Sequence, residues 1–436
     1  MKRALAVCLA TLFTTPAWSA DLVQVYQDAV TNDPKFASAR AQYEAGQERR
    51  IQGRAGLLPA VGASASTTWN EVDTHTARFG TVDYNSNAWG VQLTQPLFRW
   101  QNWVQYRQGE LQTALAEIQL GQARQDLILR VSRAYFDVLN AQDVLAAQSQ
   151  LRKAAIEQLE LAKASFEVGT VTITDVHEAQ SRFDLATAQE IAAQNELDVR
   201  RQSLAQIIGK EPSPLAGLKS GVSLARPQPD NIAEWAGAAE QGGYGVQAQQ
   251  VARQIAEREV ERSRAGHYPT LDLVATHGRN NTGFSANSGS ASRQDATTVG
   301  LQLNVPLFAG GAVSSREREA AALKVKADAD LDDARRTAAL AARQAYLGVT
   351  SGMAQVKALE AALVSSNSSL EANRLGYEVG VRINIDVLNA QTQLADTQRQ
   401  LARARYDTLV AQLQLKAAAG SLGEEDLRAV DALLAK

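Results

Sequence analysis

The chain of 436 residues contains one cysteine, Cys8, and four histidines. Cys8 lies in a segment that reads as an export signal, so the processed chain has no thiol. Disulfide bonds, zinc–thiolate sites and cysteine nucleophiles are therefore excluded. No H-E-x-x-H, G-x-S-x-G or G-x-x-x-x-G-K-[ST] pattern occurs around His75, His177, His267, His277 or elsewhere. We predict a protein that is not an enzyme and binds no nucleotide, cofactor or metal.

Long apolar runs and an excess of basic charge are also absent. Past the first 20 residues we find no run of about 18 apolar residues, which excludes a transmembrane helix. The 44 basic and 47 acidic side chains give a formal net charge of −3, so no basic excess marks a surface for a polyanion. Nucleic acid is not an expected partner. With 45% hydrophobic residues, the chain nevertheless has enough apolar content for a packed interior.

Residues 1–20 have the features of a secretory signal peptide. Two basic residues begin the segment, an apolar stretch follows, and small residues end it. Cleavage after Ser19 places Ala17 and Ser19 at the two small-residue positions, whereas cleavage after Ala20 places the bulky Trp18 at one of them. We favour the first site. Export to a bacterial periplasm or beyond fits a chain without thiols.

The rest of the chain repeats itself. Gly56-Leu57-Leu58-Pro59 is echoed by Gly266-His267-Tyr268-Pro269, and 90–98 is echoed by 300–308, both at an offset of 269 − 59 = 210 residues. A register held over this length indicates a tandem duplication. We predict a first repeat over 21–208, a linker over 209–230, a second repeat over 231–419 and a C-terminal segment over 420–436.

Each repeat holds two segments with strict alternation. Residues 61–70 and 88–98 place apolar side chains on one face and small polar ones on the other, and 271–275 and 298–305 repeat the pattern. The intervening stretches 71–86 and 280–294 are rich in Gly, Ser, Asn and Thr, which predicts exposed hairpin loops. The alternation fits a membrane β-barrel and also four strands of a soluble, half-buried sheet.

The longest segments have a helical period. Apolar residues recur every three or four positions over 103–168 and again over 314–377, which predicts helices of about 60 residues, roughly 90 Å long. Residues 175–208 and 386–419 supply shorter helical partners, with many alanines along the predicted contact. Each repeat is therefore expected to run helix, two strands, long helix, turn, helix. Prolines mark the predicted junctions of helix and strand, at Pro59, Pro96, Pro269 and Pro306.

Four strands are too few to close a barrel, and an open sheet edge would leave N–H and C=O groups unsatisfied in lipid. The chain must therefore oligomerise. Two copies would give a barrel filled by its own side chains, whereas three copies would give twelve strands and leave a lumen. Because one strand face is small and polar, we favour three. The charged helices belong in an aqueous compartment, so the predicted fold is an α+β membrane protein: a trimeric 12-stranded β-barrel continuous with a long periplasmic α-helical barrel.

The order of elements, the duplication and the turn sequences resemble the TolC family of outer-membrane efflux and secretion channels. The most specific segments are 168–176 and 376–388, with Ala20–Tyr26 and Asp33-Pro34 in support. The resemblance covers nearly the whole processed chain. It implies a homotrimer in the outer membrane of a Gram-negative bacterium, in contact with its lipid and closed at a periplasmic mouth. It also implies a passive duct, loaded by an inner-membrane ABC, RND or MFS pump through a periplasmic adaptor (membrane fusion) protein.

The resemblance assigns roles to the two turns between the helix pairs. Each turn carries a glycine after a long helix, a position that often needs a positive φ. A plain helix C-cap explains these glycines in part. In the family these turns receive the helical hairpins of the adaptor, which carries that role to Val168, Gly169, Val379 and Gly380.

The resemblance also implies a closing network just beyond the turns. Arg382 should reach Thr174 and Asp175 of a neighbouring copy, while Tyr377 should bond to Asp175 within its own chain. Asp386 would project into the lumen as a ring of three carboxylates, a candidate cation filter. Helix N-capping is the alternative role for both aspartates.

The chain departs from the family pattern at Asn389, where a second acidic ring position is expected. Cation selectivity should therefore be weaker. Trp69, Trp89, Trp100 and Trp103 are candidates for aromatic belts at the membrane surfaces, with ordinary packing as the alternative for the last two.

A periplasmic structural or adaptor coiled-coil protein without a pore is the competing interpretation of the whole chain. Long helix pairs would suffice for it, but the alternating strands and the duplication would stay unexplained. A side role in adhesion through 71–86 and 280–294 is compatible with transport. Nothing in the sequence points to one cargo, so protein toxins, proteases and small drugs are all compatible with it.

Overall fold

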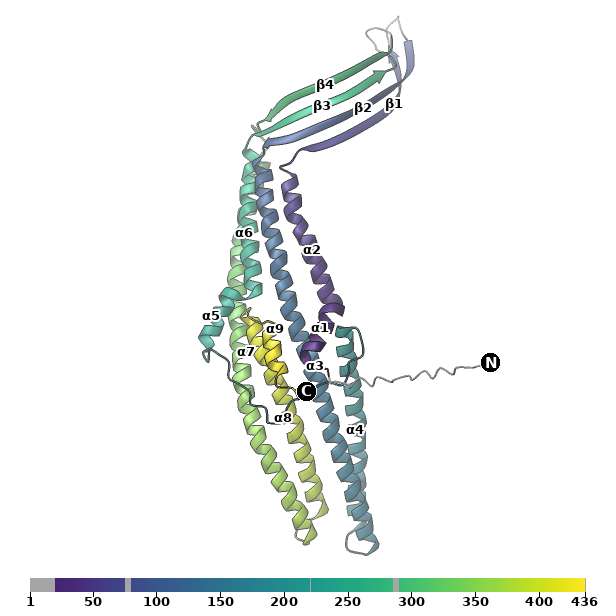
Figure 1. Ribbon diagram of the computed structural model, residues 1–436, viewed down its shortest axis with the longest axis vertical. Coiled ribbons are helices and arrows are strands. Elements are labelled where there is room, and N and C mark those ends of the chain that lie inside the picture. Colours follow the sequence, from purple (N-terminus) through teal and green to yellow (C-terminus); the bar gives the residue numbers. More distant parts are fainter. Residues whose placement is uncertain (1–19, 75–79, 220, 285–289, 436) are drawn as a thin grey trace, which may run out of the picture. The chain divides into compact units, whose positions relative to one another are not determined.

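The computed structural model describes residues 20–74, 80–219, 221–284 and 290–435 (Figure 1). The predicted signal peptide up to Ser19, and His75, lie outside these residues. The chain divides into two compact units. We call residues 39–122 and 244–337 the sheet unit, and residues 20–38, 123–243 and 338–435 the helical unit.

The sheet unit contains one antiparallel sheet in which the strands follow chain order, β1-β2-β3-β4 (Figure 1). The strands are β1 (Ala60–Thr74), β2 (Gly80–Phe98), β3 (Thr270–Thr282) and β4 (Ser292–Asn304). The two predicted hairpins are confirmed, and β2 pairs with β3, so the two repeats share one sheet. In the described part of the chain, strands β1 and β4 each have one neighbouring strand.

The register confirms the predicted faces. Leu93 lies opposite Val61 in β1 and opposite Ala275 in β3. Paired residues of an antiparallel sheet share a face. Most apolar side chains of the four strands therefore share one face, and the serines and glycines, with most of the threonines, lie on the other.

The predicted loops over 71–86 and 280–294 are wrong in extent. Strand β1 continues to Thr74, β2 already begins at Gly80, and the second hairpin is extended in the same way. Polar side chains do not prevent this extension because they bond across the strands: the Asn70 amide donates to Ser86 Oγ at 3.0 Å. The backbone ladder needs no apolar residue.

Helices make up most of the described chain. They are α1 (Leu22–Asn32), α2 (Pro34–Ala55), α3 (Trp100–Glu167), α4 (Ile173–Ile208), α5 (Ile232–Gly242), α6 (Tyr244–Arg264), α7 (Ala312–Glu378), α8 (Asn384–Ala418) and α9 (Glu424–Asp431), with a short 3-10 turn η1 (Ala265–His267). Helices α2, α3 and α7 contribute residues to both units. Among the described residues, no helix is long and apolar enough to cross a membrane.

The two long helices are confirmed, at 68 residues for α3 and 67 for α7. The expectation of a single helix ahead of each strand pair is wrong, because two helices precede each pair. In the first repeat the break falls at Asp33, which ends α1 in an extended conformation before Pro34 begins α2. Proline suits a first helical position and disfavours helix in the residue before it.

Asp33 and Arg130 form a buried ion pair in the helical unit. Arg130 donates to both carboxylate oxygens, at 2.6 and 3.2 Å, and Asp33 is only 3% exposed. Burial raises the pKa of Asp33, but the hydrogen bonds from Arg130 and from the Phe36 amide outweigh it and hold that pKa below its usual value. The pair joins α1 and α2 to α3.

Tyr135 ties together three distant segments of the helical unit. Its ring is fully buried, and its hydroxyl donates to the carbonyls of Ala20 and Ala216 at 3.1 and 2.8 Å. Asp431, near the C-terminus, accepts from the backbone N–H of Leu22 at 2.8 Å and so caps α1. Ala20 and the linker are thereby held against α3, and α9 is held against α1.

Candidate functional site

The two helix-pair turns of the helical unit have the same hydrogen-bond pattern. After α3, the N–H of Thr170 donates to Ser165 O at 2.9 Å, and Gly169 sits between them with φ +76°. After α7, Gly376 O accepts the equivalent bond and Gly380 has φ +80°. This is the Schellman ending, which requires a left-handed residue after the helix. The C-cap interpretation of both glycines is confirmed.

Space is not the reason for glycine at these turns. A Cβ added at Gly169 or Gly380 would meet no heavy atom within 4 Å, so only the positive φ selects glycine. The preceding valines project from the turns: Val168 is 75% exposed and Val379 is 65% exposed. Each turn thus presents an exposed valine side chain next to a glycine whose backbone is not covered by other atoms.

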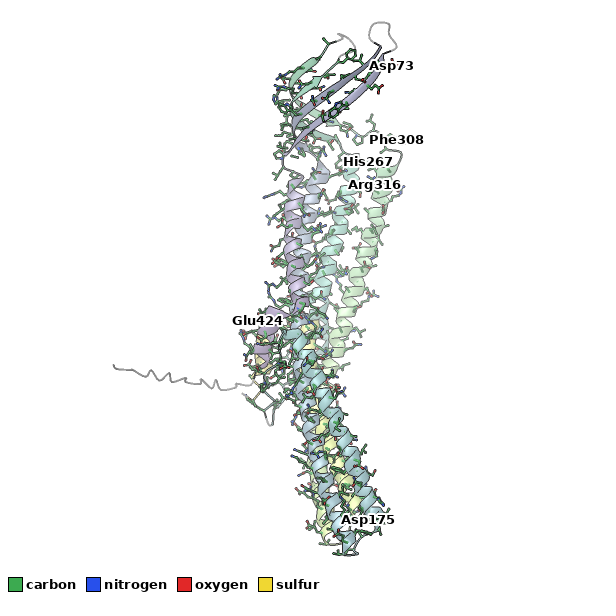
Figure 2. The ribbon with its side chains drawn as sticks, turned by 90° about the vertical axis from the view of Figure 1, so that its right-hand side faces the viewer. Asp73, Asp175, His267, Phe308, Arg316 and Glu424 are labelled. Atoms are coloured by element: carbon green, nitrogen blue, oxygen red, sulfur yellow. The ribbon has the colours of Figure 1, made fainter. Side chains whose placement is uncertain are left out.

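Asp175 completes a capping box at the start of α4. The backbone N–H and the hydroxyl of Thr172 both donate to its carboxylate, at 2.8 and 2.7 Å, and its own N–H donates to Thr172 Oγ1 at 3.4 Å. These hydrogen bonds lower the pKa of Asp175. The carboxylate is therefore ionised and fixed in place at neutral pH. Figure 2 shows Asp175 at the turn between α3 and α4.

Arg382 lies just before α8 and folds back onto α7. Its stem packs against Gly376, where a Cβ would come within 2.6 Å of Arg382 Cγ. Its guanidinium reaches Asp386, in the first turn of α8, with 3.7 Å between Nη1 and Oδ2. No local pattern singles out Gly376, since its role depends on the chain turning back after the helix.

A cavity of about 900 Å³ separates the two turns. Asp175 lines it from α4, Tyr377 from α7 and Arg382 from the segment between α7 and α8. The structure thus brings three of the four predicted network residues to one cavity, while the exposed Thr174 is not among its lining residues. Within the described chain, no hydrogen bond joins Tyr377 to Asp175. The Tyr377 ring packs instead beside Leu370 and Val387.

Asn389 takes part in a contact between α4 and α8. The guanidinium of Arg182 donates to Asn389 Oδ1 at 3.3 Å, across 207 residues of sequence. The amide oxygen of Asn389 therefore accepts the hydrogen bond that a carboxylate would accept at this position, but it carries no negative charge. No sequence pattern near Arg182 distinguishes it from other charged residues on the exposed face of α4.

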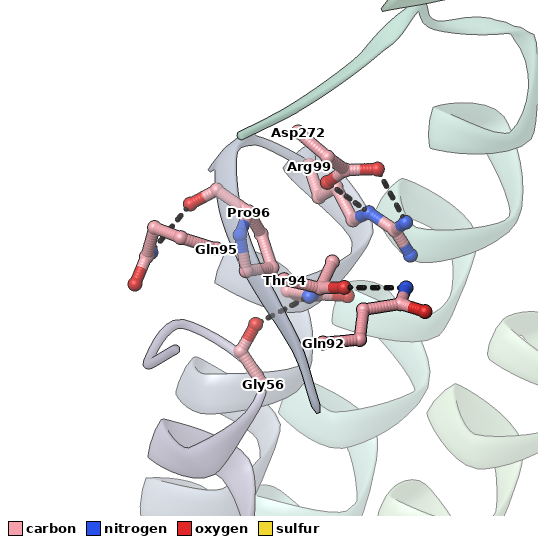
Figure 3. Close-up of polar contacts among 8 residues, drawn as sticks. Gly56, Gln92, Thr94, Gln95, Pro96, Arg99 and Asp272 are labelled. Atoms are coloured by element: carbon pink, nitrogen blue, oxygen red, sulfur yellow. Dashed lines mark hydrogen bonds and ion pairs between the residues drawn. The ribbon is translucent and has the colours of Figure 1, made fainter. Parts of the chain in front are cut away.

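A second polar cluster lies in the sheet unit, where strands pass into helices (Figure 3). Arg99, between β2 and α3, donates through Nε and Nη2 to the two oxygens of Asp272 in β3, at 2.8 and 2.6 Å. Asp272 is only 5% exposed. A bidentate pair of this kind fixes both distance and orientation. It locks the first repeat to the second at the base of the sheet.

Three of the four predicted junction prolines lie just outside the strands. Pro59 precedes β1, Pro269 precedes β3, and Pro306 follows β4. Pro96 lies inside β2, opposite Asp272, where the register shifts before Phe98. A bulge tolerates proline because the ladder is already interrupted there.

The tryptophans divide between strand and helix. Trp69 and Trp89 lie in β1 and β2 on the apolar face, whereas Trp100 and Trp103 belong to the first turn of α3 rather than to a strand end. Arg107 lies over the Trp103 ring, 5.5 Å from its centroid. All four indoles are more than a third exposed in the single chain.

Comparisons with known proteins agree with this architecture. Residues 25–210 and 236–421 each match the family described as Outer membrane efflux protein. The chain is 32% identical over 428 residues to the outer membrane protein TolC of Vibrio cholerae, covering 98% of this chain and 96% of that protein. It is 34% identical over 428 residues to the alkaline protease secretion protein AprF of Pseudomonas aeruginosa, covering 97% and 89%. The outer membrane channel CmeC of Campylobacter jejuni has the same fold, with a TM-score of 0.79 at 17% identity over 95% of this chain and 90% of that chain.

Proposed function

Because the chain belongs to the outer membrane efflux protein family and is an outer-membrane exit channel for secretion and efflux, we propose that it acts as the passive duct of a homotrimer. The matched regions cover both repeats, and the family consists of channels rather than enzymes. We assign the chain no catalytic activity. The energy for transport then has to come from a partner.

The free strand edges are the observation that supports a trimer most directly. Among the residues that the structure describes, strands β1 and β4 each lack a neighbouring strand on one side, and every residue of β4 is exposed. Open edges cannot persist in lipid. Three copies of the four-stranded sheet supply twelve strands, and their small polar face suits a water-filled lumen.

The turns of the helical unit are the proposed docking site for a periplasmic adaptor. Val168 and Val379 offer apolar contacts, and the bare backbone at Gly169 and Gly380 permits close approach of a helical hairpin. The cavity between the turns gives such a hairpin a place to enter. An inner-membrane pump of the ABC, RND or MFS type would load the duct through this adaptor.

The residues around the cavity are the proposed gate. In the closed trimer, Arg382 would exchange its long contact with Asp386 for Thr174 and Asp175 of a neighbouring copy, with Tyr377 supporting the turn. The fixed carboxylate of Asp175 and the weak 3.7 Å contact of Arg382 support this exchange. Three copies of Asp386 would form one acidic ring in the lumen, and the neutral Asn389 would leave it without a second.

Single-channel conductance in a planar bilayer tests the duct. We expect purified trimers of the processed chain to show a small, steady conductance, because a closed mouth limits the current. The native mass of the same protein is measured in parallel, so that failure to form trimers is distinguished from failure to conduct. Folded trimers that never conduct would reject the duct and favour the alternative, a periplasmic coiled-coil protein without a pore.

A further inference from the structure

Helix α8 leaves one of its faces open near the turn that precedes it. Val387 and Ala390 are buried and pack with Leu370 of α7. Asp386 and Asn389 lie three residues apart on a different face, where Asn389 is exposed and the side chain of Asp386 is 33% exposed. The proposed function directs this face towards the lumen, and the inference below rests on that proposal.

Arg182 of α4 reaches the same face of α8. Its guanidinium donates to Asn389 Oδ1 at 3.3 Å. In the described part of the chain, no other hydrogen bond joins α4 to α8. The guanidinium is therefore held at the level of Asn389, three residues from Asp386, which corresponds to about 4.5 Å along the helix axis.

The charge of Arg182 is not balanced by a carboxylate. Its guanidinium forms no ion pair with any residue that the structure describes. Asp184, two residues further along α4, accepts instead from the side-chain amide of Gln180 at 2.9 Å. Other arginines of the same two helices do pair with carboxylates, namely Arg200, Arg399, Arg403 and Arg405. Arg182 differs from these residues because its hydrogen-bond partner is neutral.

The residue at position 389 decides whether the charge of Arg182 acts on a passing ion. A carboxylate at this position would form a charge-assisted pair with the guanidinium and cancel its charge. The amide of Asn389 orients the guanidinium through the same hydrogen bond but leaves its charge in place. The neutral residue at position 389 therefore matters together with Arg182 and not by itself.

We propose that Arg182 determines the ion specificity of the duct. Three copies of the chain place three guanidiniums beside the three carboxylates of Asp386, so two adjacent rings of opposite charge cancel each other. The constriction then passes small anions about as readily as small cations. The neutral Asn389 alone would only weaken a preference for cations, whereas the guanidiniums of Arg182 remove it.

A purely structural role for Arg182 is the alternative. Its bond to Asn389 joins two helix pairs, so losing the bond would change how often the channel opens or how wide it is. The reversal potential in a salt gradient does not depend on the number of open channels. Salt separates charge from shape, because an electrostatic effect fades in 1 M salt, where the Debye length is about 3 Å, and a steric effect persists.

Reversal potentials of purified trimers in a planar bilayer, measured in a gradient of KCl, give the permeability ratio of K⁺ to Cl⁻. The R182Q variant removes the charge and keeps an amide donor, whereas R182K keeps the charge and changes the shape. The N389D variant supplies the carboxylate that would cancel the guanidinium. The double variant R182Q/N389D has two acidic rings, and D386N has none.

Arg201 supplies the matched control. It also belongs to α4, but it lines a cavity with Pro212 and Pro214 of the linker, and none of the described residues that line this cavity comes from α8. The R201Q variant changes the net charge of the trimer by the same amount as R182Q. The native mass of every variant is measured first, so that a loss of assembly is recognised before permeabilities are compared.

We expect the unmodified trimer to show little preference between the two ions at low salt. R182Q and N389D should each raise the permeability ratio of K⁺ to Cl⁻ by roughly threefold or more, because three charges change at a narrow constriction. The double variant should raise this ratio further, and D386N should lower it. R182K and R201Q should leave the ratio unchanged, and all differences should shrink in 1 M salt.

An unchanged ratio in R182Q beside a lowered ratio in D386N would overturn the role of Arg182 and leave the duct and its acidic ring intact. Equal changes in R182Q and R182K, or changes that persist in 1 M salt, would also overturn it, because they indicate a structural role. Conducting trimers whose ratio changes in neither R182Q nor D386N would reject the acidic ring together with this inference. Folded trimers that never conduct would reject the proposed duct itself.

Discussion

Replacing Arg382 by serine should unlatch the proposed gate. In the single chain Arg382 is 60% exposed at its side chain and approaches Asp386 at 3.7 Å, so its own-chain contact is weak. An exposed ion pair contributes about 0–1 kcal/mol. Three symmetric copies would bias the closed state by up to about 3 kcal/mol, which corresponds to at most about a 150-fold change in the ratio of open to closed channels.

Single-channel recording of the R382S variant measures this ratio. We expect a higher open probability and larger conductance than in the unmodified protein, at equal trimer mass. The difference should shrink in 1 M salt, where the Debye length falls to about 3 Å. Arg374→Ser is the matched control because Arg374 lines the same cavity from α7.

Two carboxylate variants identify the partner of Arg382. If the latch forms between copies, D175N should reproduce the open channel of R382S and D386N should not. If the contact with Asp386 within the chain is the latch, the pattern reverses. Equal open probability for R382S, R374S and the unmodified trimer would refute the gate.

Three further changes have expected outcomes. R130M leaves the buried Asp33 carboxylate unpaired and should cost about 3 kcal/mol of unfolding free energy at neutral pH. Because pairing lowers the pKa of Asp33, the stability that the pair contributes should be fully present above about pH 4 and should be lost as pH falls through the lowered pKa. Y406F removes the 2.7 Å hydrogen bond to Asp143, whose pKa burial already raises, and should cost about 1–3 kcal/mol in thermal unfolding. G380A strains a turn that needs φ +80°, and should reduce export in cells while leaving bilayer conductance unchanged.

Matched controls separate these effects from general damage. Y346F removes a 2.6 Å bond to Asp230 at an exposed site and should leave thermal unfolding unchanged. The double variant R130M/D33N should be more stable than R130M, because no charge is left buried. G237A changes a glycine without positive φ and should export normally. An R130M protein as stable as the unmodified chain at neutral pH, or a G380A protein with normal export, would contradict the reasoning.

Local sequence patterns were sufficient for the elements and for part of the site. The helical period over 103–168 predicts α3 nearly to its ends, and the glycine after it predicts the turn. The hairpin extents were missed because serine, threonine and asparagine suit a loop and a polar strand face equally well. The break before α2 was missed although Asp33-Pro34 signals it: proline suits the first position of a helix and disfavours helix in the residue before it.

The contacts that position the candidate site join residues far apart in the sequence. Arg182 reaches Asn389 across 207 residues, and Arg99 reaches Asp272 across 173. Neither pair has a local period or motif, since either partner alone is one charged or amide residue among many. The proposed gate network consists of contacts between copies. The packing of helices within one chain therefore does not reveal it.

The sequence by itself determined the duplication, the two long helices, the two faces of the strands and the glycines of the turns. Each of these follows from spacing along the chain or from the φ that a single residue can adopt. Only the tertiary structure decided that β2 pairs with β3, that Arg382 rests on Gly376, and that Asp431 caps α1. These outcomes depend on which distant surfaces meet, and the energy of such contacts is set by geometry that no local pattern encodes.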